Sequence, residues 1–372
     1  MKKAKKERLS NLLTVSVCLA IVISLGISVY ALPHESFSER ENRALSGFPS
    51  FSAQAVSNGS FFSDISDFYS DQFAYRDLFV SLKTTAERLL LKRESNGIIL
   101  AKDGYLLNKG NTSTDILQKN LLALKSLDIP KSRIFIVPRA IDVLSDFLPK
   151  TYGTTVEENT RKLIHTALPN AIYADGQLKN AAKNGGYVWF KTDHHWTADG
   201  AYIAYLSLAE SLGFTPYAQS EFAREAVSTD FLGSTYSKSG LYSAQSDSIV
   251  LYRYAEDSSL TVHNRESGTV ENGLYHLDKL SKKDKYLVFL GGNYAHISIT
   301  DGSGTRPSLL IVKDSYANAL IPFLARHFDL EIIDPRYYRG SISDLTKSLS
   351  PSDTLFLFGI STLEDTPLFQ KN

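Results

Sequence analysis

The segment Lys191-Thr192-Asp193-His194-His195-Trp196-Thr197 places one carboxylate, two imidazoles and an indole side by side. Residues two apart in an extended loop project to the same side, so Asp193 and His195 share one face and His194 and Trp196 the other. An imidazole that a carboxylate orients is the usual base for a serine nucleophile. The segment therefore predicts His195 as a base and Asp193 as its orienting acid. The alternative is that local hydrogen bonds merely satisfy both histidines.

A helix is predicted directly after this segment. Thr197 suits an N-cap, Asp199 favours the positive end of the helix dipole, and Gly213 suits a C-cap. Asp193 to Trp196 then lie in the loop that enters the helix.

Further along the chain, short apolar segments alternate with helical patterns. We expect a hairpin over residues 96–107, strands at 134–137, near 172 and 188, and at 286–290, 309–312, 330–333 and 355–358, and helices at 114–127, 156–168, 316–327 and 343–348. Continuously apolar strands between helices are typical of a parallel sheet buried on both faces. The expected fold is a three-layer α/β/α architecture with a mostly parallel sheet. Residues of about 220–285 form an irregular insertion, with antiparallel strands near 249–254.

Ser315 follows one of these strands. The strand ends at Val312, Lys313-Asp314 turn the chain, and a helix is expected from about Tyr316. Ser315 then emerges at the carboxyl edge of the sheet, where open α/β folds place their ligands, beside the N–H groups of a helix N-terminus. The alternative is an N-cap serine without chemistry.

The N-terminus is basic and then apolar. Five lysines and arginines within residues 2–8 precede an uncharged segment from Leu12 to Ala31, and about 20 such residues match a hydrocarbon core of about 30 Å. We expect a cytoplasmic basic tail at 1–10, a transmembrane signal-anchor at 11–31, a juxtamembrane connector with amphipathic helices at 32–95, and the main domain at 96–372. A cleaved signal peptide ending near Val29-Tyr30-Ala31 is the alternative. Both interpretations export residues 32–372.

Composition narrows the possible functions. Forty basic and 40 acidic residues give no net charge, so the chain offers no global electrostatic attraction for nucleic acid. The only cysteine, Cys18, lies inside the apolar segment, which excludes a disulfide framework, a cysteine–zinc cluster or a cysteine nucleophile in the exported body.

Asp193-His194-His195 is also a string of metal ligands, and it superficially resembles the DHH phosphoesterases. Those enzymes need further aspartates at upstream strand ends, where this chain offers only Asp142 and Asp175 in unsuitable places. We therefore expect no metal and no other cofactor.

Four motifs resemble the DHHW protein family of Gram-positive bacteria. They are Ser38-Glu39-Arg40-Glu41-Asn42-Arg43, Asp193-His194-His195-Trp196, Lys313-Asp314-Ser315-Tyr316-Ala317-Asn318 and Asp334-Pro335-Arg336-Tyr337-Tyr338. That family is similar to the SGNH-hydrolase-like proteins that O-acetylate alginate and other exported polysaccharides. The resemblance implies an SGNH-like catalytic domain in which Asp193, His195 and Ser315 form the catalytic triad.

The resemblance also implies further site residues. SGNH enzymes stabilise an oxyanion with backbone N–H groups and an asparagine, so Gly292, Asn293 and Asn318 are candidates beside the Ser315 N–H. The candidates for a sugar groove are Arg336, Tyr337, Tyr338 and Trp196; packing against the N-terminal helices or in the core is their alternative.

The expected function is extracytoplasmic transfer of an acyl group, acetyl above all, to a cell-envelope polysaccharide through an acyl-serine. Such a transferase implies a multispanning partner that carries acyl groups across the membrane. In the systems that the chain resembles, this partner is a membrane-bound O-acyltransferase. A carbohydrate esterase of the same fold and a non-catalytic scaffold of a modification complex are the alternatives. The expected location is the cell membrane, with a single span and the catalytic domain outside.

Overall fold

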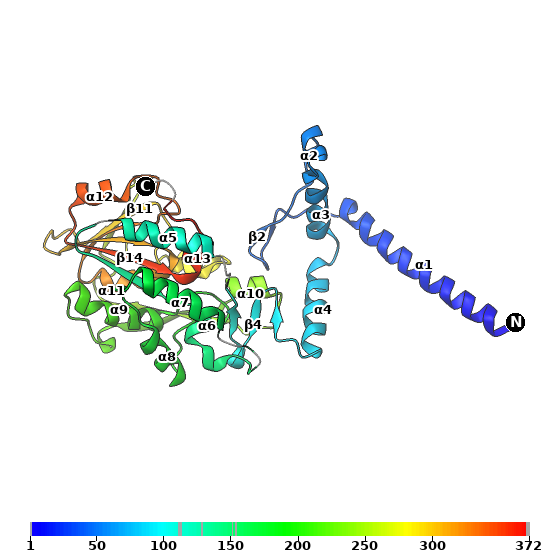
Figure 1. The fold of residues 1–372 in the computed structure, drawn as a ribbon, viewed down its shortest axis with the longest axis horizontal. Coiled ribbons are helices and arrows are strands. Elements are labelled where there is room, and N and C mark those ends of the chain that lie inside the picture. Colours follow the sequence, from blue (N-terminus) through cyan, green and yellow to red (C-terminus); the bar gives the residue numbers. More distant parts are fainter. Residues whose placement is uncertain (1, 111–113, 128, 151, 153–154, 370–372) are drawn as a thin grey trace. The chain divides into compact units, whose positions relative to one another are not determined.

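The computed structural model describes residues 2–110, 114–127, 129–150, 152 and 155–369. The chain forms two compact units. One comprises residues 1–92 with Gly240–Tyr242, and the other comprises residues 93–239 and 243–372 (Figure 1).

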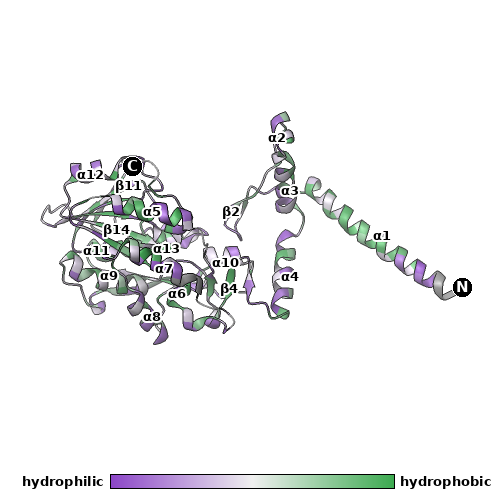
Figure 2. Ribbon diagram, viewed as in Figure 1, coloured by the Kyte–Doolittle hydropathy of each residue, from purple (hydrophilic) through white to green (hydrophobic). Residues whose placement is uncertain are grey.

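The first unit begins with a long apolar helix, α1 (Lys2–Ala31), of which residues 6–31 are long and apolar enough to cross a membrane (Figure 2). A small hairpin and three helices follow, β1 (Phe37–Ser38), β2 (Arg43–Ala44), α2 (Ala53–Ser57), α3 (Ser60–Gln72) and α4 (Arg76–Leu89). Asp71 of α3 accepts two hydrogen bonds from the Arg43 guanidinium, at 2.5 and 2.8 Å, and one from the Ser46 N–H at 2.9 Å. This carboxylate therefore ties the hairpin to α3.

The second unit is built on a seven-stranded sheet of order β10-β9-β11-β13-β12-β14-β6. The strands are β6 (Ser132–Val137), β9 (Thr261–Asn264), β10 (Val270–Asn272), β11 (His296–Thr300), β12 (Ser308–Lys313), β13 (Asp329–Ile333) and β14 (Asp353–Gly359). β13, β12, β14 and β6 pair in parallel, whereas β10, β9, β11 and β13 pair antiparallel. The sheet is thus mixed, and the expectation of a mostly parallel sheet is wrong. The antiparallel strands come from residues 261–300, where no α-helix carries the chain back across the sheet.

Helices cover both faces of the parallel strands. Side chains alternate along each strand, so Leu309 and Ile311 of β12 pack on one face and Leu310 and Val312 on the other. The first face is covered by α8 (Asp175–Lys183), α9 (Ala198–Leu212) and α11 (Ile321–Leu324), and the second by α5 (Thr114–Ser126), α7 (Thr155–Ala167), α12 (Ile342–Leu349) and α13 (Ile360–Asp365). The three layers of the expected α/β/α architecture are present.

Smaller elements complete the unit. They are a three-stranded sheet of β3 (Glu94–Ser95), β4 (Ile98–Leu100) and β5 (Leu106–Asn108), a pair of β7 (Ala223–Phe231) and β8 (Asp247–Arg253), and the helices α6 (Ala140–Val143) and α10 (Ser234–Ser239). The hairpin predicted at 96–107 and the antiparallel strand predicted near 249–254 are confirmed.

Four predicted elements differ from the structure. The strands expected near 172 and 188 are only isolated bridges, which pair Ile172 with Phe135 and Trp189 with Trp196. Residues 286–290 do not form a strand, because Lys285–Val288 is a 3-10 turn. The single helix predicted at 316–327 is a 3-10 turn, Ser315–Ala319, followed by the short α11. Apolar runs of this length do not distinguish a buried strand from a buried turn.

Candidate active site

Asp193, His195 and Ser315 lie in one hydrogen-bonded row. His195 Nδ1 is 2.6 Å from Asp193 Oδ1, and His195 Nε2 is 2.8 Å from Ser315 Oγ. The Asp193 carboxylate accepts the Nδ1 proton, which leaves Nε2 as the acceptor for the serine hydroxyl. All three residues are buried, with Ser315 the most accessible at 9%. The geometry is that of a base poised to take the proton of a serine.

Thr197 fixes the end of the histidine loop as the sequence predicts. Its hydroxyl accepts from the Gly200 N–H at the start of α9, and Gly213 closes the same helix at a φ of 69°. The loop is therefore the N-terminal entry of a helix.

Ser315 follows β12 at the carboxyl edge of the sheet. The capping hydrogen bond at this elbow comes from the neighbouring Asp314, whose Oδ1 accepts from the Tyr316 N–H at 3.0 Å. The other oxygen of Asp314 accepts from the Gly359 N–H at 2.8 Å. Because Asp314 is the cap, the alternative of Ser315 as an N-cap is wrong. The Ser315 hydroxyl is therefore available to His195.

Asp193 is held by a turn that the sequence did not single out. Its Oδ2 accepts from both the N–H and the hydroxyl of Ser234, at 2.7 and 2.8 Å. Burial alone would raise the pKa of Asp193, but His194, His195 and the Ser234 N–H together hold that pKa well below its usual value. Asp193 is therefore ionised at neutral pH.

Asp247, at the start of β8, holds the beginning of the histidine loop through hydrogen bonds. This buried carboxylate accepts from the Lys191 N–H at 2.9 Å, and from the Thr192 N–H and hydroxyl at 2.8 and 2.5 Å. The Tyr187 hydroxyl also donates to it. The insertion that the sequence leaves irregular thus fixes the backbone just before Asp193.

Tyr286 positions the His195 ring. The two rings stack with centroids 3.8 Å apart and planes 5° from parallel. The Tyr286 hydroxyl donates to the Ser315 carbonyl at 3.2 Å. Burial raises the Tyr286 pKa well above its usual value, so the phenol stays neutral. One residue therefore contacts both the base and the nucleophile.

His194 differs from His195 in both contacts and exposure. Its side chain is 39% exposed, and its Nδ1 lies 2.6 Å from the Ser234 hydroxyl. The protein packed around it and the adjacent His195 lower the pKa of His194 to about 4. Asp193, His194 and His195 bring their ligand atoms within 4.8 Å of one another. However, both nitrogens of His195 are already hydrogen-bonded, so a metal there would have to displace Asp193 or Ser315.

Two oxyanion candidates are joined by a buried lysine. Lys313 Nζ donates to Asn318 Oδ1 at 2.6 Å and to Asn293 Oδ1 at 3.1 Å, and Asn318 Nδ2 donates to Asn293 Oδ1 at 3.1 Å. Burial lowers the pKa of Lys313 to about 8. Gly292 precedes Asn293 with a φ of 156°. The amide orientations of both asparagines are thus set by an ammonium group, which the sequence did not indicate.

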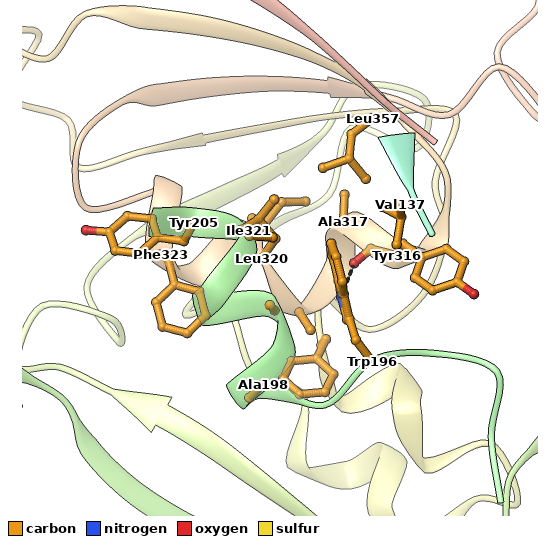
Figure 3. Close-up of a cluster of buried hydrophobic side chains, with 14 of the residues drawn as sticks. Val137, Trp196, Ala198, Tyr205, Tyr316, Ala317, Leu320, Ile321, Phe323 and Leu357 are labelled. Carbon is orange, nitrogen blue, oxygen red and sulfur yellow. Dashed lines mark hydrogen bonds between the residues drawn. The ribbon is translucent and has the colours of Figure 1, made fainter. Parts of the chain in front are cut away.

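The four candidates for a sugar groove differ in burial and in contacts. Trp196 is completely buried, and its indole N–H donates to the Tyr316 carbonyl at 2.9 Å (Figure 3), so its assignment to a substrate wall is wrong. Arg336 forms a two-pronged ion pair with the buried Asp334, at 2.9 and 2.6 Å. Tyr338 lines a pocket of about 170 Å³ together with Arg336, and Tyr337 is 48% exposed.

A curated relative, the probable alginate O-acetylase AlgJ of Pseudomonas fluorescens, is 23% identical over 212 residues, which are 52% of this chain and 50% of the relative. The chain thus spans about half the length of that relative.

Solved structures share the fold. The crystal structure of a DHHW family protein from Eubacterium siraeum is 22% identical with a TM-score of 0.60, over 73% of this chain and 94% of that one. The structure of Bacillus cereus PatB1 is also 22% identical with a TM-score of 0.60, over 74% and 99%. The family model described as DHHW protein matches residues 132–333. The chain therefore belongs to the DHHW protein family.

Proposed function

We propose that this protein transfers an acetyl group to hydroxyls of a cell-envelope polysaccharide through an acyl-serine at Ser315. The observation that carries the proposal is the row of hydrogen bonds from Asp193 through His195 to Ser315. Similarity to a probable alginate O-acetylase supports the acetyl group and a polysaccharide acceptor.

In the proposed mechanism, His195 Nε2 takes the Ser315 hydroxyl proton as Oγ attacks the carbonyl carbon of an acetyl ester or thioester. Asp193 stabilises the imidazolium that forms. The tetrahedral intermediate collapses, the leaving group receives the proton from Nε2, and the acetyl group stays on Ser315. A sugar hydroxyl then gives its proton to Nε2 and attacks the acyl-serine. Collapse of the second intermediate returns the proton to Ser315.

The developing oxyanion needs hydrogen-bond donors in both halves of this cycle. We assign the first to the Ser315 backbone N–H, which has no hydrogen-bond partner among the described residues. Asn318, three residues further along, and Asn293, to which it is hydrogen-bonded, are the proposed side-chain contributors, with Gly292 as a backbone donor. Lys313 adds a positive charge behind both amides. Arg336, Tyr337 and Tyr338 remain the proposed sugar-contacting residues.

The proposed location follows from α1. Residues 11–31 anchor the chain in the cell membrane, residues 1–10 stay in the cytoplasm, and residues 32–95 connect the anchor to an SGNH-like catalytic domain, 96–372, outside. Acetyl donors made in the cytoplasm do not reach that side unaided. A membrane-bound O-acyltransferase is therefore the proposed partner that supplies the acyl group.

Transfer, hydrolysis and a purely structural role differ in one experiment. The full chain in detergent is given a nitrophenyl acetate donor with alginate oligosaccharides, or with oligosaccharides from the producing cell's envelope, and acetylated sugar and free acetate are both quantified. We expect acetylated sugar from the wild type and neither product above background from Ser315→Ala. Acetate alone, despite added acceptor, would make the protein an esterase. No turnover, with unchanged envelope acetylation in Ser315→Ala cells, would identify a scaffold.

A further inference from the structure

Helix α4 carries an uninterrupted stripe of exposed apolar side chains. The stripe consists of Tyr75, Leu78, Phe79, Leu82, Ala86 and Leu89, spaced three or four residues apart so that they share one face. Exposure of its large members runs from 43% for Phe79 to 80% for Leu89. Helix α4 contains both hydrophobic and hydrophilic residues (Figure 2). Contiguous exposed apolar side chains of this kind mark sites of contact with a membrane or another protein.

The contacts of α1 with the rest of its unit lie at its C-terminal end. The Ala74 N–H donates to Ser28 Oγ at 3.3 Å, and the hydroxyls of Tyr69 and Tyr30 are hydrogen-bonded. Val29 is buried, whereas the apolar side chains of α1 from Leu9 to Ile27 are largely exposed. Among the described residues, the rest of the unit therefore contacts the apolar helix at its C-terminal end (Figure 1).

The contact between Ala74 and Ser28 fixes where α4 begins relative to the end of α1. Ser28 lies three residues before the end of α1, about 5 Å along the helix axis. Ala74, and with it Tyr75 at the head of the stripe, is thus held at the level where the apolar span ends. Exposed tyrosines are typical of that boundary between hydrocarbon and headgroups.

We propose that α4 lies in the outer surface of the membrane that α1 crosses, with the apolar stripe facing the lipid. This inference rests on the proposed membrane anchor. The charge of the segment fits the same surface, because residues 76–92 carry four basic and two acidic side chains, which favours contact with anionic headgroups. A helix lying there holds the connector close to the bilayer, from which a membrane partner would deliver acyl groups.

The test uses the full chain in vesicles of phosphatidylcholine and phosphatidylglycerol that contain a lipid-attached quencher. In a Cys18→Ser background, Leu82→Cys and Lys83→Cys each carry one fluorophore, on the stripe and beside it on the same helix. We expect several-fold stronger lipid quenching at position 82 than at 83, and the reverse for aqueous iodide. The native chain labelled at Cys18, inside α1, reports insertion of the anchor itself.

The outcomes separate the anchor from the stripe. Absence of lipid quenching at Cys18 contradicts the anchor, and with it both proposals about location. Quenching at Cys18 with equal iodide access at 82 and 83 overturns the docking of α4 alone. Protection of position 82 from both quenchers, with dimers on cross-linking, assigns the stripe to a second copy of the chain and also overturns it.

Discussion

At the scale of single residues, the site is a short relay with a second set of contacts behind each member. Ser234 holds Asp193, Tyr286 stacks on His195, and Asp314 makes the capping bond that leaves Ser315 free. Each supporting contact fixes the orientation of one of the three proposed catalytic residues. Substitution of Asp193, His195 or Ser315 should therefore reduce activity more than substitution of a residue that supports them.

Asp193→Asn tests the orienting acid. The amide cannot accept the Nδ1 proton as the carboxylate does, so His195 adopts the wrong tautomer and kcat/KM for an acetyl ester should fall about 10³- to 10⁴-fold. His194→Gln is the matched control, because His194 lies outside the relay, and less than about a tenfold loss is expected there. Equal losses in both variants would contradict the assignment of His195 as the base.

Lys313→Met tests the charge behind the two asparagines. Removing the ammonium should lower the acylation rate about 10- to 100-fold, less than or similar to loss of a direct oxyanion donor. The pH profile identifies the cause. The pKa of Lys313 is lowered to about 8, so the wild-type rate should fall as the pH rises through about 8 and the charge is lost. The variant should lack that fall, and an unchanged basic limb would show that Lys313 is only structural.

Gly233→Ala tests the space around Asp193. A Cβ at this position would lie 2.4 Å from both Cβ and Oδ2 of Asp193, so the carboxylate must move and activity should drop at least about tenfold. Gly176→Ala in α8 is the control, since nothing lies within 4 Å of its added Cβ. Activity assays and thermal melts of both variants separate displacement of Asp193 from general unfolding. Wild-type kcat/KM in Gly233→Ala would contradict the importance of this turn.

At the scale of elements, the sequence predicts the parts that depend on local pattern. Thr197 and Gly213 bound α9 as expected, and β12 ends at Lys313, one residue after the predicted end at Val312. Asp193, His195 and Ser315 could be proposed because each sits at such a boundary.

The supporting residues could not be found in that way. Ser234 and Asp247 lie 41 and 55 residues from their partners in the histidine loop, in a stretch without clear periodicity. Tyr286 falls in an apolar run that reads equally well as a strand. Their roles come from tertiary contacts, which a single sequence does not display.

Asp71→Asn tests the tie between α3 and the β1–β2 hairpin. The Arg43 hydrogen bond lowers the pKa of Asp71 to about 2 despite burial, so this stabilisation is present above pH of about 4 and lost as the pH falls through about 2. The variant should lose about 1–3 kcal/mol at neutral pH, seen as faster hydrogen exchange in α3. Asp67→Asn, exposed on the same helix, is the control. Equal exchange in both variants at neutral pH would contradict the tie.

At the scale of the whole molecule, different parts of the second unit position Ser315 and His195. The parallel half of the sheet, β13, β12, β14 and β6, provides the carboxyl edge from which Ser315 emerges, and the insertion between α9 and β9 anchors the loop that carries the base. The match to the DHHW family spans residues 132–333, which include β6, β12, β13 and the insertion, whereas β14 lies beyond it. The apolar α1 and the stripe on α4 belong to the part before it, to which we assign attachment at the membrane.

The acyl-serine is the most direct test. The full chain is mixed with an acetyl ester, quenched in acid at short times, and digested for peptide mass spectrometry. We predict one acetyl group on the peptide that contains Ser315 in the wild type, none in Ser315→Ala or His195→Ala, and wild-type labelling in Ser207→Ala, a control serine on α9 bonded only to a backbone carbonyl. Turnover of the ester with no acetyl group on Ser315 at any time would contradict the account.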